Sequence, residues 1–144
     1  MRAGVLNGPE AMVLFEQARE VGFALPAVNV INTNSINAVL ETAAKVHSHV
    51  IIQLSFGGAE FFIGKNASEH KECNAINGAI AAAHYIHIAA QIYQVPVILH
   101  TDHAAKKLLG WIDGLLEAGE TYFNTHARPL FTSHMLDLSE ESLE

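Results

Sequence analysis

Apolar and polar positions along the chain follow two different periods. Short runs rich in valine, isoleucine and leucine are typical of buried strands. They alternate with longer stretches in which apolar residues recur every three or four positions, as on one face of a helix. Strands are expected at residues 24–30, 49–55, 95–99 and 130–135, and helices at residues 12–22, 34–47, 75–94 and 106–118. Asn34 or Ser35 is expected to cap the second helix, and Gly119 to end the fourth.

Strands that alternate with helices over short connections form βαβ units, which build parallel sheets. Right-handed crossovers place all the connecting helices on one side of a curling sheet. The predicted class is therefore α/β: a partial (β/α)8 TIM barrel with about the first four strand-helix units, preceded by an N-terminal helix. An open doubly wound sheet is the alternative, but no Gly-rich turn follows the first strand.

A complete barrel of this kind needs at least roughly 200 residues, whereas this chain has 144. We therefore expect residues 1–144 to be the N-terminal part of a single barrel domain in a longer protein. Two further expectations concern local structure. The polar residues 57–74 are expected to form an irregular loop over a site, and Ser139, followed by Glu140 and Glu141, to cap a final helix.

Composition narrows the range of partners. The formal net charge is −7, with the few basic residues scattered, which argues against nucleic acid but allows a small anionic substrate. Cys73 is the only cysteine, so no intrachain disulfide is possible, and a reducing, cytoplasmic compartment is favoured. The Ala-rich residues 75–94 are interrupted by polar side chains and lack basic flanks. They predict a packed helix rather than a membrane span, and we expect neither a membrane partner nor a signal peptide.

Polar side chains follow the expected strands at the points where these end. Because the carboxyl ends of parallel strands meet at one face of a barrel, we expect these side chains to share a pocket. A lone histidine or aspartate more often caps an element, but here three titratable groups fall within four residues. The candidates are Asn29, Ser55, His100, Asp102, His103 and Asp137.

These residue types suit metal-assisted chemistry. An imidazole can bind a divalent metal, and amide and hydroxyl groups can bind an oxygen-rich substrate. A metal that polarises a carbonyl, beside a carboxylate that takes a hydroxyl proton, suits carbon–carbon bond cleavage. The residues alone thus predict a metal-assisted lyase or hydrolase. His84 and His87 lie three positions apart on one helix face and are interpreted as packing residues rather than metal ligands.

Four sequence words carry a resemblance to a known family: ALPAVNV, SINAVLETAAKV, VPVILHTDHAAKKLLGWIDGLLEAGE and FTSHMLDLSEESLE. From about residue 15 to residue 144 the chain resembles the zinc-dependent class II fructose-bisphosphate aldolases. The resemblance implies a metal-dependent aldehyde-lyase that reversibly cleaves fructose 1,6-bisphosphate to dihydroxyacetone phosphate and D-glyceraldehyde 3-phosphate in glycolysis and gluconeogenesis. Its partners are then small-molecule sugar phosphates, and the full-length protein is expected to be a homodimer.

The resemblance also implies a role for each matched residue. The last histidine of HTDH, here His103, is a zinc ligand, and the preceding Asp102 is the catalytic acid and base. Asp137 belongs to a second metal position. Ser55 contacts the triose phosphate and Asn29 lines the same pocket, although either residue could instead cap a strand end.

The family's remaining zinc ligands would lie beyond residue 144, so the zinc ligand set is incomplete in this chain. We therefore expect the isolated 144-residue chain to be inactive with added zinc. Two alternatives stay open at this point. One is a tagatose-bisphosphate aldolase of the same family, and the other is a catalytically inactive half-barrel fragment that pairs its sheet edges with another chain.

Overall fold

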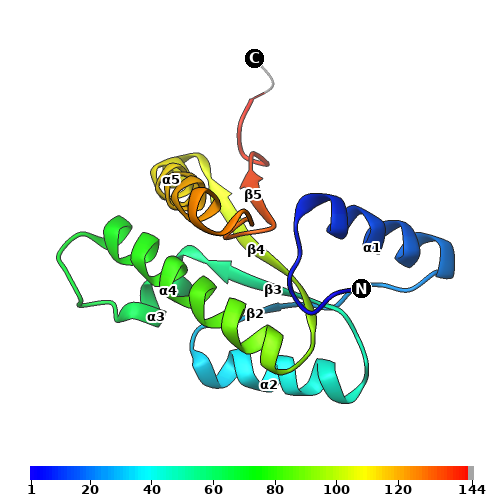
Figure 1. Cartoon of the computed structure of the whole chain (residues 1–144). Coiled ribbons are helices and arrows are strands. Elements are labelled where there is room, and N and C mark those ends of the chain that lie inside the picture. Colours follow the sequence, from blue (N-terminus) through cyan, green and yellow to red (C-terminus); the bar gives the residue numbers. More distant parts are fainter. Residues whose placement is uncertain (143–144) are drawn as a thin grey trace.

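The structure, a computed structural model, describes residues 1–142 (Figure 1). Helices and strands alternate along the chain after a short first strand. The elements are β1 (Gly4–Val5), α1 (Gly8–Val21), β2 (Ala27–Asn29), α2 (Thr33–Lys45), β3 (Val50–Ser55), α3 (Phe56–Ile63), α4 (Lys71–Ile92), β4 (Pro96–Ala105), the 3-10 turn η1 (Lys106–Leu108), α5 (Leu109–His126) and β5 (Ser133–Asp137).

All pairs of neighbouring strands run parallel, and β2, β3, β4 and β5 lie side by side in sequence order. β3 takes one edge of β4, from the Val50–Val97 pair to the Ser55–Asp102 pair. β1 and β5 share the other edge, because β1 pairs with the start of β4 and β5 with its second half. This sheet is the one expected of a partial (β/α)8 barrel.

A single threonine joins β1 to β5 along the shared edge. The Thr132 hydroxyl donates to the Leu6 carbonyl oxygen at 2.7 Å and accepts a hydrogen bond from the Leu99 N–H at 3.1 Å. The Thr132 N–H in turn donates to the Leu99 carbonyl at 2.8 Å. The side chain therefore satisfies backbone groups where β1 ends and β5 has not yet begun.

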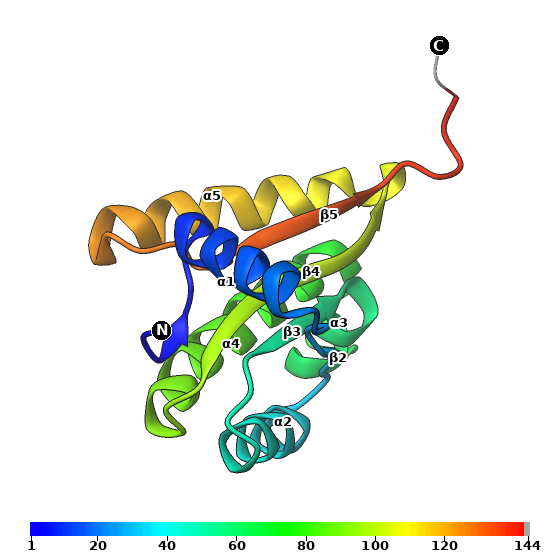
Figure 2. The same ribbon diagram turned by 90° about the vertical axis from the view of Figure 1, so that its right-hand side faces the viewer.

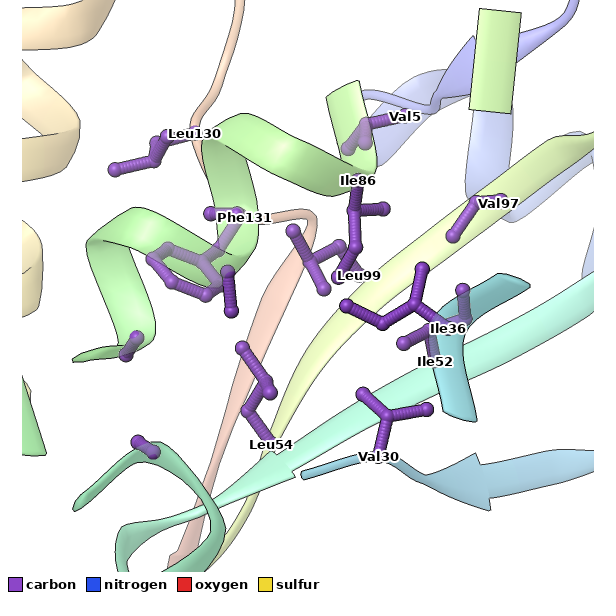
Figure 3. Close-up of a cluster of buried hydrophobic side chains, with 14 of the residues drawn as sticks. Val5, Val30, Ile36, Ile52, Leu54, Ile86, Val97, Leu99, Leu130 and Phe131 are labelled. Carbon is purple, nitrogen blue, oxygen red and sulfur yellow. The ribbon is translucent and has the colours of Figure 1, made fainter. Parts of the chain in front are cut away.

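The sheet is covered differently on its two faces. Side chains from alternate positions of β3 and β4 point toward α2, α4 and α5 and form the main core, as Figure 3 shows for Ile52, Leu54, Val97 and Leu99. α1 lies on the opposite face (Figures 1 and 2). There it forms a smaller core of Leu6, Ala11, Leu14 and Ile98.

Local sequence signals fix where the first two helices begin. Asn7 caps α1 in a capping box with Glu10, whose carboxylate also binds the Arg2 guanidinium at 2.6 Å. α2 begins earlier than expected, because its N-cap is Asn32 rather than Asn34 or Ser35. The Asn32 side chain accepts from the Ser35 N–H, and the Ser35 hydroxyl accepts from the Asn32 N–H.

The prediction of an irregular loop at residues 57–74 is wrong for much of this segment. α3 follows β3 without a break, because the Ser55 hydroxyl accepts a hydrogen bond from the Gly58 N–H at 3.1 Å and caps the helix. α4 then begins at Lys71 and carries Cys73 on its exposed surface. Only residues 64–70 remain irregular.

Several predicted boundaries are also wrong. α5 continues past Gly119 to His126 and ends at Ala127, which has a left-handed φ of 52°. The last strand is Ser133–Asp137 rather than residues 130–135, because Leu130 and Phe131 are buried in the core before the strand begins. The first predicted strand, residues 24–30, is shortened to Ala27–Asn29, and β1 has no counterpart in the prediction.

The helix expected after Ser139 is not formed as far as residue 142, since Ser139 and Glu140 form a turn. The expected segment also includes residues 143 and 144, which lie outside the described residues. Among residues 1–142, no helix combines the length and the apolar character needed to cross a membrane. The prediction of a packed helix at residues 75–94 is confirmed by α4, most of whose alanines are buried.

Candidate active site

Asp102 lies at the centre of the polar residues near the carboxyl ends of the strands. The Asn29 side-chain amide donates to Asp102 Oδ2 at 2.9 Å, and the Gln53 amide donates to Asp102 Oδ1 at 3.3 Å. These three residues come from β2, β3 and β4, which are neighbours in the sheet. Each carboxylate oxygen therefore has its own amide donor, which fixes the orientation of the Asp102 side chain.

An irregularity in β4 gives His103 its place beside Asp102. Between the Thr101–His134 pair and the Ala104–Leu136 pair, β4 contributes two residues and β5 contributes only Met135. This two-against-one count is a β-bulge. At the bulge His103 has a left-handed φ of 49°, a conformation that residues other than glycine rarely adopt.

The bulge shifts the alternation of side chains by one position. Val97, Leu99 and Thr101 are buried on the side of the sheet that α2, α4 and α5 cover, which we call the helix-covered side. After Thr101, the next buried residue is Ala104 rather than His103. Asp102 and His103 are consecutive, yet neither enters the helix-side core. A regular strand would send His103 toward the helices. Because of the bulge, His103 lies instead beside Asp102 at the rim of the sheet.

His103 bridges two carboxylates. Its Nδ1 lies 3.1 Å from Asp137 Oδ2, and its Nε2 lies 3.7 Å from Asp102 Oδ1. The hydrogen bond to Asp137, followed by the charge of Asp102, raises the pKa of His103 above its ordinary value. The pKa of Asp137 is lowered to about 2, first by the Ser139 hydroxyl, which donates at 2.6 Å, and then by His103.

Ser55 lies next to Asp102 across the β3–β4 pairing. Its hydroxyl accepts the hydrogen bond from Gly58 that caps α3. The capping function considered for this serine is therefore present in the structure. A contact between Ser55 and a substrate stays a prediction.

The remaining histidines are arranged in different ways. His100 Nδ1 lies 2.8 Å from the Ser133 hydroxyl, and its partial burial lowers the His100 pKa. His84 and His87 lie on α4 and pack around the Tyr122 ring of α5, with centroid distances of 5.4 and 5.1 Å. His87 Nε2 also lies 3.0 Å from the Leu130 carbonyl. This packing in the helix layer agrees with the interpretation of both residues.

The structure thus links four of the predicted residues in one series of contacts, from Asn29 through Asp102 and His103 to Asp137. Sequence reasoning missed Gln53, which binds the same carboxylate as Asn29. The signal was present in the alternation of the third strand. Gln53 stands two positions before Ser55, so both belong to the face that β3 turns away from the helices.

The donor set fits a divalent zinc ion in kind but not in number. Imidazole nitrogen and carboxylate oxygen are ordinary zinc ligands, and the His103 side chain is 63% exposed and lies against two carboxylates. Within residues 1–142, however, no three His, Cys, Asp or Glu side chains are arranged to hold a metal. The described residues therefore do not form a complete metal site by themselves.

Fold and site together define a class: a partial parallel α/β barrel with an acid–imidazole group at the carboxyl ends of its strands. The sequence profile of class-II fructose-bisphosphate aldolases matches residues 10–144. The chain belongs to this family.

Similar proteins extend over the whole chain. The class 2 fructose-bisphosphate aldolases of Buchnera aphidicola (from Acyrthosiphon pisum) and of Escherichia coli K12 are each 58% identical to it, over 146 and 145 residues. A crystal structure of fructose-bisphosphate aldolase from Campylobacter jejuni superposes with a TM-score of 0.94 at 57% identity and covers 99% of this chain. The superposition confirms the predicted fold class. The chain spans about 40% of the length of each of these relatives.

Proposed function

We propose that the chain is the N-terminal part of the barrel domain of a zinc-dependent class II fructose-bisphosphate aldolase. The proposed reaction is the reversible cleavage of fructose 1,6-bisphosphate to dihydroxyacetone phosphate and D-glyceraldehyde 3-phosphate. The observation that carries the proposal is the series of contacts from Asn29 through Asp102 and His103 to Asp137, in a chain that belongs to this family.

Asp102 is the proposed catalytic acid and base. In the cleavage direction, its carboxylate accepts the proton of the substrate hydroxyl next to the breaking carbon–carbon bond, and it returns the proton in the condensation direction. The two amide donors, Asn29 and Gln53, hold the carboxylate in one orientation. A fixed acceptor avoids the entropic cost of ordering the group at the moment of reaction.

His103 and Asp137 are the proposed metal-binding residues of this chain. His103 offers an imidazole nitrogen for zinc, and Asp137 offers a carboxylate for a second metal position. When bound, zinc would supply Lewis-acid polarisation of the substrate carbonyl. The remaining ligands would come from the part of the longer protein that follows residue 144.

Asn29 and Ser55 are proposed to contact the sugar phosphate substrate. Asn29 is the last residue of β2, and Ser55 is the last residue of β3, beside Asp102. Both positions flank the proposed acid–base group, as substrate-orienting groups must. We further propose that the full-length protein is a cytoplasmic homodimer, in line with the single, unpaired cysteine and with the family resemblance.

A chimeric enzyme tests the proposal. It joins residues 1–144 of this chain to the remaining part of the Campylobacter jejuni relative, and we refer to it as the chimera. We expect it to cleave fructose 1,6-bisphosphate, to lose activity with a chelator and to regain it with zinc. We also expect the 144-residue chain alone to show no turnover with added zinc.

Parallel assays with tagatose 1,6-bisphosphate identify the preferred sugar. A higher kcat/KM for tagatose 1,6-bisphosphate would assign the chain to the alternative aldolase. A folded, zinc-containing chimera without turnover on either sugar would contradict the proposed function.

A further inference from the structure

A polar contact comes directly before the bulge in β4, on the helix-covered side of the sheet. Thr101 Oγ1 lies 2.8 Å from His134 Nδ1, and the two residues are directly paired between β4 and β5. Thr101 is fully buried. Its hydroxyl therefore needs a protein partner, and His134 supplies it.

His134 is held as a neutral imidazole by its surroundings. Most of its side chain is buried, and the Phe131 ring lies 5.2 Å away, centroid to centroid. Burial, followed by the charge of His100, lowers the pKa of His134 to about 4. A neutral ring has one donor and one acceptor nitrogen, so Nδ1 can pair with the threonine hydroxyl in either sense.

This contact occupies the last regular pair before the bulge. The next pair, Ala104 with Leu136, has two apolar side chains, which do not select one register over another by hydrogen bonding. A slip of one residue in a strand exchanges the faces of all its side chains. Such a slip between β4 and β5 would remove the extra residue and turn His103 toward the helices.

We propose that Thr101 and His134 form a positioning pair that sets the register of β4 on β5. Their hydrogen bond places the bulge after Thr101, and the bulge places His103 beside Asp102 and Asp137. Neither residue touches the candidate active site, because both side chains lie on the helix-covered side of the sheet. The effect on turnover rests on the proposed function, whereas the effect on the geometry of β4 does not.

Four substitutions test the pair. Thr101→Val and His134→Phe each remove the hydrogen bond but keep the approximate shape of the side chain. Thr101→Ser and His134→Asn keep a polar group near the same position. Tyr85→Phe is the matched control, because it removes another hydrogen bond within the helix-side layer, the 2.8 Å contact from Tyr85 Oη to Asn37 Oδ1.

In the chimera, we expect Thr101→Val and His134→Phe to lower kcat by about 10- to 100-fold, since small displacements of catalytic groups have effects of this size. KM should change little, and Thr101→Ser and His134→Asn should stay within about threefold of the parent. The double variant Thr101→Val/His134→Phe should be no slower than the slower single variant. The control, Tyr85→Phe, should keep the parental kcat.

Nuclear magnetic resonance of the 144-residue chain without metal gives a readout independent of activity. Loss of the hydrogen bond should shift the ring-nitrogen resonances of His103 and the backbone amide resonances of Asp102 and His103, and Tyr85→Phe should leave them in place. If Thr101→Val does not fold, the comparison of His134→Phe with His134→Asn decides. Unchanged resonances and parental kcat in His134→Phe would overturn the proposal.

The outcomes separate this inference from the proposed function. An inactive parent chimera together with shifted His103 resonances in the variants would reject the proposed function and support the positioning pair. An active parent chimera in which all four variants keep the parental kcat would reject the positioning pair alone.

Discussion

The two halves of β4 differ in composition and in the regularity of their pairing. In residues 96–99, Pro96 and Val97 pair with β1, β3 pairs with the strand from Val97 onward, and Val97, Ile98 and Leu99 are all buried. Residues 100–105 are largely polar and contain the bulge. The first half is covered on one face by α2, α4 and α5 and on the other by α1 (Figure 2). Burial on both faces explains its uninterrupted apolar run.

The comparison shows that stability and chemistry can depend on different parts of one strand. A well-packed first half fixes the backbone, and the second half carries the candidate catalytic and metal-binding groups on that support. Polar groups at the ends of such strands need a rigid base to hold their geometry. Substitutions in the first half should therefore lower the stability of the fold, and substitutions in the second half should lower activity.

The largest effect is expected in the polar half, on activity. Asp102→Asn in the chimera removes the proposed acid–base group, and an amide cannot accept hydrogen bonds from both Asn29 and Gln53 on its two terminal atoms. We expect kcat to fall by about 10²- to 10⁴-fold. The urea unfolding midpoint should stay close to that of the parent. A variant with more than a tenth of the parental kcat would refute the role of Asp102.

The apolar half should respond in stability. Leu99 is completely buried between β4 and the helices. Leu99→Ala leaves a cavity in the main core, and we expect the free energy of unfolding of the 144-residue chain to fall by about 2–5 kcal/mol. Urea titration followed by circular dichroism measures this loss. A loss below about 1 kcal/mol would show that residues 96–99 are not the rigid base described above.

A smaller effect is expected on the pH dependence of stability, through His134, which pairs with Thr101 of the polar half. The pKa of His134 is about 4 in the folded chain, against 6.5 for an unperturbed histidine, so the unfolded chain binds a proton first as the pH falls. Stability is therefore complete above pH 6.5 and decreases toward pH 4, by roughly 1–2 kcal/mol for this partly exposed group.

His134→Asn should remove this share of the pH dependence. The measurement is the difference in urea midpoint between about pH 7 and about pH 4.5, on either side of the ordinary histidine pKa, compared between the parent chain and the variant. Histidines that do not interact with His134 affect both chains alike, so the difference between the two chains reports on His134 and its interaction with His100. Equal pH dependence in both chains would contradict the burial of a neutral imidazole at this position.

The smallest effect is expected far from β4. Arg19 and Glu16 form an ion pair on α1 at 2.7 Å, and both side chains are largely exposed. Water screens such pairs, so Arg19→Ala should change the free energy of unfolding by less than about 0.5 kcal/mol. The same urea titration provides the control for the larger effects in β4. A change as large as that of Leu99→Ala would undo the contrast between surface and core.

Apart from β1 and α3, the order of strands and helices could be predicted from the sequence, because the other elements have a clear apolar period. The boundaries of the elements were harder to predict. The prediction that α5 ends at Gly119 is wrong, because the helix continues along α4 and packs Tyr122 against His84 and His87. A glycine lowers helix propensity only modestly, and tertiary packing of the following turns outweighs it.

The polar residues of the candidate site could be named from the sequence, but their arrangement could not. Reading HTDH as residues past the strand end missed that they continue β4. A bulge depends on the register between two strands and leaves no period in either one. The partnership of Thr101 with His134 and the contact of Gln53 with Asp102 depend on that register in the same way.

The most direct test of the account is the location of zinc in a crystal of the chimera, found by anomalous scattering at the zinc absorption edge. We predict a zinc ion at about 2.0–2.1 Å from a ring nitrogen of His103, on the side of the sheet that carries Asp102. A zinc ion bound elsewhere, with His103 turned toward the helices, would contradict both the assignment of the site and the role of the bulge.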